Sequence, residues 1–236
     1  MGRAKKLALW LGGGAAVFVA IVAVGVLVLF RDSATPLSGE DKAGLYVYQT
    51  TGFETASALG GGRHDYPAET YLSVVVEDCG TAYRWQALEE RWDETLLCED
   101  GRLDRTTSWH KWFGVEDLSH YICDASAHVV PIGDETTWAF QCENAGVTTV
   151  HWVYEVVGIE TVEIGGEEVE ATHIVATETD SGTTVGTGTH HRWVLTNPYL
   201  VVKERVDIAN TTESPIGGVD YVEQYEIVLT SLAPSE

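Results

Sequence analysis

Residues 147–157 read VTTVHWVYEVV, and this stretch decides the fold class. Val, Thr, Trp and Tyr dominate it, and these residue types fit the pleated, half-buried surface of a sheet. Apolar and polar side chains alternate along it, so one face of the segment can be buried while the other meets water. The segment therefore predicts a β-strand.

Similar segments continue to the end of the sequence, and turn residues separate them. Gly165-Gly166 is typical of a hairpin, and Asn197-Pro198 marks a loop. The predicted strands in this half are residues 162–164, 171–177, 187–195, 199–208 and 221–232. Tight turns between consecutive strands favour an antiparallel meander over βαβ units. We therefore predict an all-β fold, an antiparallel curved sheet in the form of a half-barrel or a sandwich, with about ten or eleven strands.

Residues 45–146 have the same character, with one exception. Predicted strands lie at residues 45–49, 70–77, 118–123 and 136–142. Within residues 85–97, apolar side chains recur at the spacing of a helix, at Trp85, Leu88, Trp92 and Leu96. This segment is the best candidate for a helix outside the membrane, although two short strands also fit it.

The N-terminus has the pattern of a membrane anchor. Arg3, Lys5 and Lys6 make residues 1–6 a basic tail, and residues 7–30 then run for 24 residues without a charge. A helix of that length spans about 36 Å, enough to cross a hydrocarbon core of about 30 Å. Basic flanks stay on the cytoplasmic side, so the chain after the anchor is expected outside the cell membrane.

The rest of the chain divides into a tether, residues 31–44, and a β domain, residues 45–236, with a subdivision near residue 145 left open. A cleaved signal peptide is the rival interpretation, but its apolar region is usually about 7–15 residues long and ends in small residues. Here Arg31 and Asp32 close a longer run. We therefore predict an uncleaved single-pass anchor, with the N-terminus in the cytoplasm and most of the chain extracytoplasmic.

Small residues recur every four positions along the anchor, at Ala8, Gly12, Ala16 and Ala20. Such a stripe lets two membrane helices approach closely, so self-association through this face is one expectation. Small residues are also common in membrane spans, and the stripe leaves both interpretations open.

The part of the chain beyond the anchor is strongly acidic. The whole sequence carries a formal charge of −22, and without Arg3, Lys5 and Lys6 it has 11 basic against 36 acidic residues. Such a surface repels phosphate backbones, so we expect no nucleic-acid partner. No D-x-[DN]-x-[DN]-G calcium loop occurs, and the sequence predicts no cofactor and no metal site.

Four cysteines lie beyond the anchor, at Cys79, Cys98, Cys123 and Cys142, with spacings of 19, 25 and 19 residues. None forms C-x-x-C, which disfavours a zinc site, and an extracytoplasmic location favours two disulfides. Four cysteines allow three pairings. The two equal spacings, each followed by a turn-like sequence, predict the pairs Cys79–Cys98 and Cys123–Cys142.

No constellation typical of an enzyme is recognisable, because a hydrolase needs a nucleophile with a base beside it. His64-Asp65 is the most enzyme-like dipeptide, but a solvated loop or a capping contact is the simpler explanation. His190 and His191 are adjacent in a predicted strand and point to opposite faces, so His173 could complete at most a pair with one of them. We predict a protein that is not an enzyme.

Aromatic residues are the strongest binding signal in the sequence. Trp109, Trp112 and Phe113 form the densest cluster. Such side chains can present a platform to a ligand, although tryptophan also packs the core of a sheet. These three residues are the candidates for facing a ligand.

Residues 190–194 (HHRWV) and 197–202 (NPYLVV) resemble a strand–turn–strand of the lipoprotein-carrier half-barrels of bacterial cell envelopes. In that family a long curved antiparallel sheet wraps an apolar cavity. The resemblance covers the chain from Val147 onward and implies an apolar ligand held in a concave sheet. The chain departs from the family in having four cysteines and no lipidated cysteine, and no functional residue carries over.

These features predict a membrane-anchored domain of the cell envelope with a binding role. The first hypothesis is a carrier or sensor of an apolar ligand. The alternative is an anchored scaffold that meets a protein partner through a sheet edge or face, without a small-molecule ligand.

Overall fold

The computed structural model describes residues 43–58, 61–112, 114–196, 198–215 and 217–235. The predicted tail, the anchor with its stripe of small residues, and most of the tether lie outside the described residues. Phe113 lies outside them too. The described residues contain no apolar helix of membrane-spanning length.

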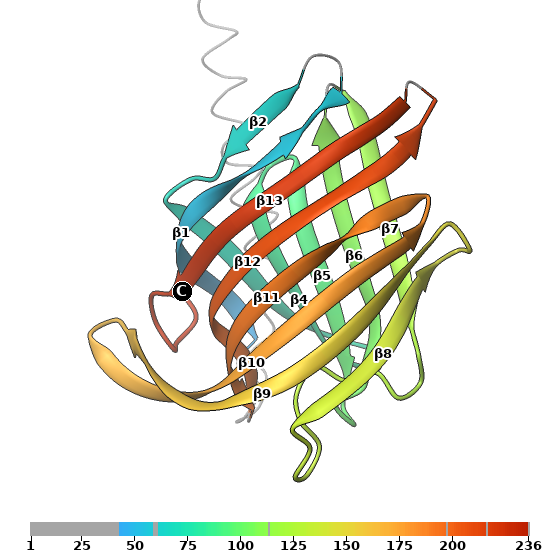
Figure 1. Cartoon of the computed structure of the whole chain (residues 1–236). Coiled ribbons are helices and arrows are strands. Elements are labelled where there is room, and N and C mark those ends of the chain that lie inside the picture. Colours follow the sequence, from blue (N-terminus) through green and yellow to red (C-terminus); the bar gives the residue numbers. More distant parts are fainter. Residues whose placement is uncertain (1–42, 59–60, 113, 197, 216, 236) are drawn as a thin grey trace, which may run out of the picture. The chain divides into compact units, whose positions relative to one another are not determined.

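Thirteen strands form one antiparallel sheet (Figure 1). In chain order they are β1 (Gly44–Ala56), β2 (Gly62–Asp65), β3 (Glu69–Glu77), β4 (Gly80–Leu88), β5 (Arg91–Cys98), β6 (Leu103–Trp112), β7 (Val115–Cys123), β8 (Thr137–Asn144), β9 (Thr148–Ile164), β10 (Glu167–Gly182), β11 (Thr184–Thr196), β12 (Tyr199–Ser214) and β13 (Gly217–Leu229). From β3 to β13 each strand is hydrogen bonded to the next along the chain. The predicted antiparallel meander is confirmed.

The sheet closes on itself because its first strand pairs with its last. β1 runs antiparallel to β13, with Tyr48 opposite Leu229 and Ala56 opposite Tyr221. On its other edge β1 pairs first with β3 and then with the short β2. Twelve strands thus form a closed barrel, and β2 extends one edge. The predicted half-barrel or sandwich is wrong on this point, because no local pattern connects the two ends of the domain.

Residues 85–97 form a β-hairpin and not a helix. They belong to β4 and β5, in which Trp85 stands opposite Asp93 and Ala82 opposite Leu96. Trp85 is buried in the core, whereas strand alternation turns Trp92 outward. Pairing with β3 and β6 on either side outweighs the helical spacing of the apolar residues, because tertiary context decides such short segments.

Apolar side chains fill much of the barrel. One cluster includes Tyr46, Tyr48 and Trp85, and a second includes Phe140 and Tyr154. A space of about 20 Å³ remains beside Tyr46. It has room for about one water molecule. The apolar part of the interior therefore offers no room here for a lipid-sized ligand.

Both disulfides have the predicted pairing. Cys79 joins Cys98, with Cα atoms 4.7 Å apart, and Cys123 joins Cys142, with Cα atoms 3.9 Å apart. The first links the turn between β3 and β4 to the end of β5, and the second links β7 to β8. No free cysteine occurs in the part of the chain that the structure describes.

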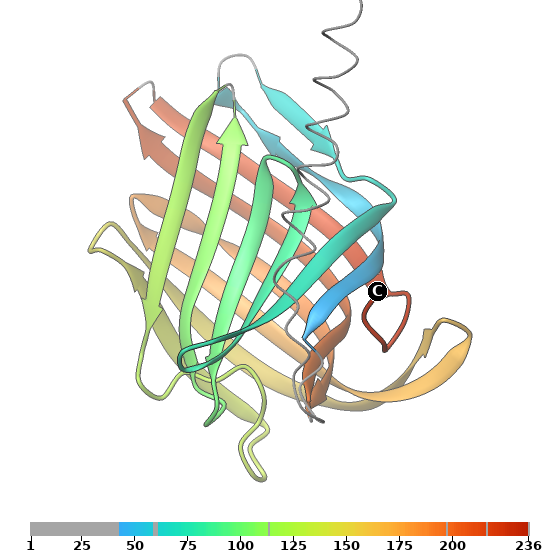
Figure 2. The ribbon, with the colours of Figure 1, turned by 180° about the vertical axis from the view of Figure 1, so that it is seen from behind.

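The seam between β7 and β8 is short. Two residue pairs, Ile122–Glu143 and Cys123–Cys142, join the strands in the ladder. Figures 1 and 2 show the two strands diverging from this end of the barrel. Residues 115–121 thus have no ladder partner on their β8 side among the described residues.

Candidate functional site

Charged side chains gather on the inner face of β1, β5, β6 and β13. Glu54 of β1 stands opposite Glu223 of β13, and Arg91 of β5 stands opposite His110 of β6. Asp93 follows Arg91 by two residues, so strand alternation puts it on the same face. Buried charges are costly unless they are paired, and these side chains form one connected network.

Glu54 is the centre of this network. Its carboxylate binds Nδ1 of His64 at 2.8 Å, Nδ1 of His110 at 3.2 Å and the hydroxyl of Tyr221 at 2.9 Å. Burial raises the pKa of this carboxyl, whereas His110, Arg91 and His64 lower it by more. The resulting pKa lies below its ordinary value, so Glu54 is ionised at neutral pH.

Arg91 is 3% exposed and offsets part of the acidic charge. Its Nη2 donates to Asp93 Oδ2 at 2.5 Å and to both carboxylate oxygens of Glu223 at 3.2 Å. Its Nε lies 3.8 Å from Glu54, and the hydroxyl of Tyr66 donates to Glu223. The Nε and Nη1 donors of Arg91 have no hydrogen-bond acceptor among the described residues. Both nitrogens are buried, and an oxygen atom that entered the interior of the barrel would satisfy them.

Solvent reaches the network from one side. Asp93 faces the interior, and yet its side chain is 38% exposed. Burial raises the pKa of Asp93, but Arg91, His110 and Ser108 together lower it by more, so the carboxylate is ionised. At the rim, the ring of Trp112 stacks on that of His64, with centroids 3.9 Å and planes 7° apart. The polar end of the interior is therefore accessible, in contrast to the packed apolar part.

Ser108, His110 and Glu54 are connected in the order of a catalytic triad. Ser108 Oγ lies 3.0 Å from Nε2 of His110, and Nδ1 of His110 faces Glu54. A hydrogen bond from Ser108 also contributes to the lowered pKa of Asp93. Ser108 and His110 therefore connect Asp93 to Glu54 within the polar network.

A second polar group lines the inner face of β10–β12. Arg192 Nε donates to Glu204 Oε1 at 2.6 Å, and Nδ1 of His190 lies 3.3 Å from the same oxygen. Burial raises the pKa of Glu204, but Arg192 and His190 lower it to about 2. Burial lowers the pKa of His190, but Glu178 and Glu204 raise it to about 9. Burial and the neighbouring Glu178 raise the pKa of Asp180 to about 7.

The predicted aromatic candidates are divided between the two faces of β6. Trp109 points outward, where its ring stacks on that of Trp92 at a centroid distance of 6.3 Å. Trp112 is three residues further along the strand and points inward over His64. Trp109 and Trp112 therefore share no platform, and Trp112 alone of the two lies beside the polar network.

The polar network carries little signal in the sequence. His64 stands out through its neighbour Asp65, yet Asp65 pairs with Arg63 at 2.7 Å and takes no part in the network. Two local patterns each place two members on one strand face: Arg91 and Asp93 on β5, and Ser108 and His110 on β6. Glu54 and Glu223 come from β1 and β13, which meet only in the closed barrel.

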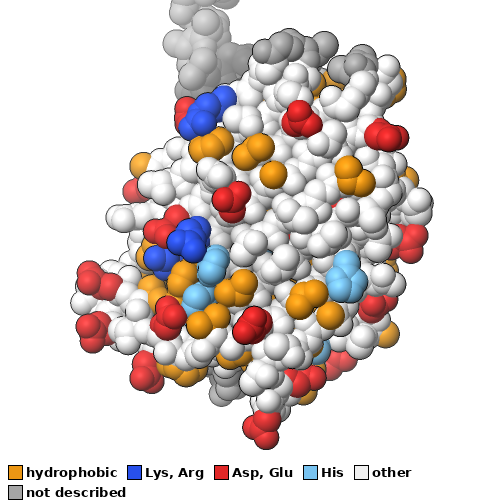
Figure 3. Space-filling view, in the orientation of Figure 1, with side chains coloured by type: hydrophobic (Ala, Val, Ile, Leu, Met, Phe, Trp, Pro, Cys, Tyr) orange, Lys and Arg blue, Asp and Glu red, His pale blue; other side chains and the backbone are white. Residues whose placement is uncertain are grey.

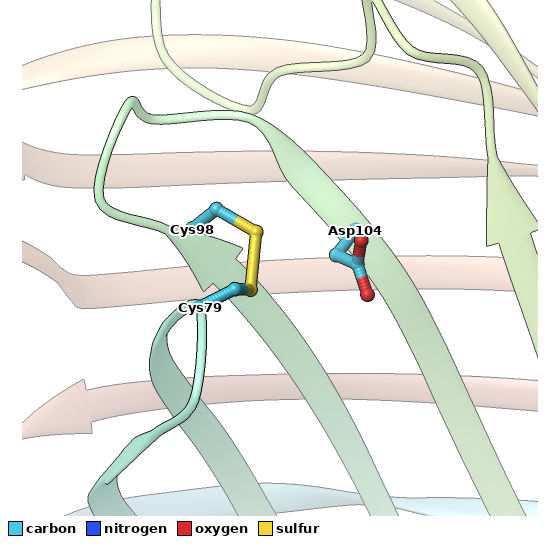
Figure 4. A group of neighbouring side chains, drawn as sticks. All are labelled: Cys79, Cys98 and Asp104. Atoms are coloured by element: carbon cyan, nitrogen blue, oxygen red, sulfur yellow. A yellow bond between two sulfur atoms is a disulfide. The ribbon is translucent and has the colours of Figure 1, made fainter.

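A group of three potential metal-ligand residues lies at the end of β5, formed by Cys79, Cys98 and Asp104 (Figure 4). The two sulfur atoms are bonded to each other in the first disulfide, and Asp104 pairs with Arg102 at 2.9 Å. Metal binding by cysteine needs a thiolate, so this group holds no metal while the disulfide is intact.

A lipoprotein is among the known structures to which this chain is similar. It is the hypothetical lipoprotein YmcC from Escherichia coli (K12), with a TM-score of 0.38 and 15% sequence identity over 89% of this chain and 97% of that chain. No family model matches the sequence, and no curated protein matches it.

Proposed function

We propose that this protein is a non-enzymatic binding protein of the cell envelope that takes a small polar ligand at the accessible end of its barrel. The observation that carries the proposal is the buried guanidinium of Arg91. Two of its donors lack an acceptor among the described residues, beside the exposed carboxylate of Asp93. A ligand with an oxygen acceptor next to a donor would satisfy both groups. Sugars and amino acids belong to this class.

Packing supports a polar ligand over the apolar one predicted from the sequence. The apolar part of the interior is filled by side chains, whereas the other part holds the polar network of Glu54, Arg91 and Glu223, which reaches solvent at Asp93. An apolar ligand would cover these charges without replacing the hydrogen bonds of water, which is unfavourable. A barrel of about eight strands is just filled by its own side chains, so a twelve-stranded one has width for a site.

The proposed location rests on the N-terminal sequence and on the disulfides. Residues 7–30 would hold the protein in the cell membrane as a single helix, with the basic tail in the cytoplasm and the barrel outside. Two disulfides suit an oxidising compartment, which supports the outer placement of the barrel.

Native mass spectrometry of the full chain, extracted from membranes in detergent, tests the ligand. We expect a co-purified polar molecule in the wild type and its loss in Asp93→Asn. Glu155→Gln, which changes an exposed carboxylate on β9, is the matched control and should retain it. A bound lipid would favour the apolar alternative. The proposal would be overturned if the wild type carried no bound molecule and if millimolar sugars and amino acids left its melting temperature unchanged.

A second candidate function is the docking of a protein partner on β7. Residues 115–121 lack a ladder partner on their β8 side within the part of the chain that the structure describes, and Val115 and Leu118 on this strand are 67% and 51% exposed. An open edge of this kind can pair with a strand from another protein. A photo-crosslinking residue at Leu118 should then capture a partner in cells, and one at exposed Ile159 on β9 should not. Equal capture at both positions would remove this candidate.

A further inference from the structure

Two histidines meet on the outer face of the barrel, on the other side of the sheet from the polar networks. Nε2 of His173 on β10 lies 3.2 Å from Nδ1 of His191 on β11. Figure 3 shows histidine side chains on this outer face, next to Lys and Arg side chains and apolar ones. The neighbouring His190 points inward to Glu204, as alternation along the strand requires.

The backbone brings the two rings together by a diagonal step across the ladder. His173 stands opposite Trp193, and His191 stands opposite Val175. The register shifts next to His173 in the ladder of β9 and β10, and next to Trp193 in the ladder of β11 and β12. Such irregularities re-aim side chains and are over-represented beside functional sites.

Glu160 on β9 binds the ring nitrogen of His173 that does not face His191. Its Oε1 lies 2.9 Å from Nδ1 of His173, and its Oε2 accepts from Nε1 of Trp193 at 2.8 Å. The ring of Trp193 stacks on that of His173, with centroids 4.3 Å apart. Because the Glu160 carboxylate can only accept, Nδ1 of His173 donates to it, and Nε2 is the nitrogen that faces His191. A carboxylate behind a histidine is the usual support of a metal ligand.

We propose that Nε2 of His173 and Nδ1 of His191 together bind one late first-row divalent cation, with Cu²⁺ held more tightly than Zn²⁺. Two nitrogens bonded to one metal at about 2.0–2.1 Å lie about 2.9–3.4 Å apart in square-planar or tetrahedral geometry. The observed 3.2 Å falls in this range. Water completes the coordination, and the Nδ1 proton of His191 is exchanged for one on Nε2, so the ring stays neutral.

Some features around the His173–His191 pair favour the binding of a cation, and nearby positive charges oppose it. Burial, Arg205 and His173 lower the pKa of His191, and a lowered pKa reduces the competition of protons with a metal. Arg205 stands opposite His191 in the ladder and also repels a cation. Lys203, the other cation here, is paired with Glu226 at 3.3 Å. The positive charge of Arg205 therefore lowers the affinity of this site for a cation.

Copper titration of the full chain in detergent, after treatment with a chelator, tests the proposal. Electron paramagnetic resonance should show one tight Cu²⁺ site with two nitrogen ligands, and this signal should be absent from His173→Ala and from His191→Ala. His151→Ala removes an exposed histidine of β9 that lies outside the pair, and it should bind as the wild type does. Glu160→Gln should weaken binding about 10–100-fold, and Arg205→Gln should tighten it.

The melting temperature of each variant without metal separates loss of ligation from loss of folding. If His191→Ala does not fold, His191→Gln, which keeps a polar side chain of similar length, takes its place. A two-nitrogen signal that persists in both histidine variants, or equal Cu²⁺ affinity in the wild type and His191→Ala, would overturn the proposal. Neither result depends on the ligand proposed for the barrel interior.

Discussion

Two carboxyl groups on the inner face of the barrel, those of Glu204 and Asp180, have different neighbours, and their pKa values differ for this reason. Glu204 lies between Arg192 and His190, and its pKa falls to about 2. Asp180 lies near Glu178, and burial together with that acid raises its pKa to about 7. These two acids therefore give the barrel opposite dependences of stability on pH.

Because the pKa of Asp180 is raised, we expect the free energy of unfolding to fall as the pH rises from about 4 to about 7. Its folded pKa lies above the unfolded value of about 3.9, so its contribution is fully present below pH 3.9 and is lost as the pH passes 7. Asp180→Asn should flatten this slope and be about 1–3 kcal/mol more stable than the wild type at pH 7, because partial exposure screens the full effect.

Urea unfolding at several pH values between 4 and 7 measures the effect of this substitution. The folded pKa of His190 is about 9 and its unfolded value is about 6.5, so its stabilising contribution is fully present below about pH 6.5 and is lost as the pH rises through 9. His190 is present in both proteins, so the difference between their slopes reports on Asp180. Identical slopes in the wild type and Asp180→Asn would contradict the prediction.

Glu54→Gln should destabilise the barrel by about 3–5 kcal/mol, since it removes one carboxylate from a buried ionic network and leaves Arg91 short of a partner. Urea unfolding at pH 7 measures the change. Glu155→Gln on the outer face is the control, with an expected change within about 0.5 kcal/mol. If both substitutions cost the same, Glu54 is not the centre of the network.

At the scale of strands, the two disulfides close loops of equal separation, 19 residues each, at unequal places. Cys79–Cys98 lies where β4 and β5 are paired along most of their length. Cys123–Cys142 lies at the two-pair seam between β7 and β8. The same covalent constraint therefore supports a strong ladder in one case and a weak one in the other.

Replacing either pair by serine should cost about 3 kcal/mol through the entropy of the unfolded chain. Loss of Cys123–Cys142 should in addition speed amide hydrogen exchange in β7 and β8, because few ladder bonds hold that seam. The Cys79/Cys98 variant is the matched control for loop length. Equal exchange in β7 and β8 of both variants would show that the seam does not depend on its disulfide.

For the whole molecule, the proposed orientation in the membrane makes a direct prediction. A protease added outside intact cells should remove most of the chain and leave a small membrane-bound fragment that contains residues 7–30. Immunoblots with tags at the two ends detect the products. Full protection in cells with an accessible surface would contradict the topology, and a soluble product that starts near Ala34 would show that the anchor is cleaved.

Local sequence was sufficient for the strand content, the antiparallel meander and both disulfides. The alternation of apolar and polar residues, as in residues 147–157, and turn residues such as Gly165-Gly166 act over a few positions. They can therefore be recognised in the sequence alone. The equal cysteine spacings worked for the same reason, because each pair belongs to strands close in sequence. Residues 85–97 failed because their pattern fits two structures, and pairing with neighbouring strands decided between them.

Only the tertiary structure decided the closure of the barrel and the composition of its sites. Tyr48 meets Leu229, and Glu54 faces Glu223, across nearly the whole domain, and such contacts depend on the summed registers of every strand between them. The sequence by itself determined which residues alternate between the two faces of each strand, as with His190 and His191. It could not determine which charges would face each other inside, because burial and pairing energies exist only after the sheet has closed.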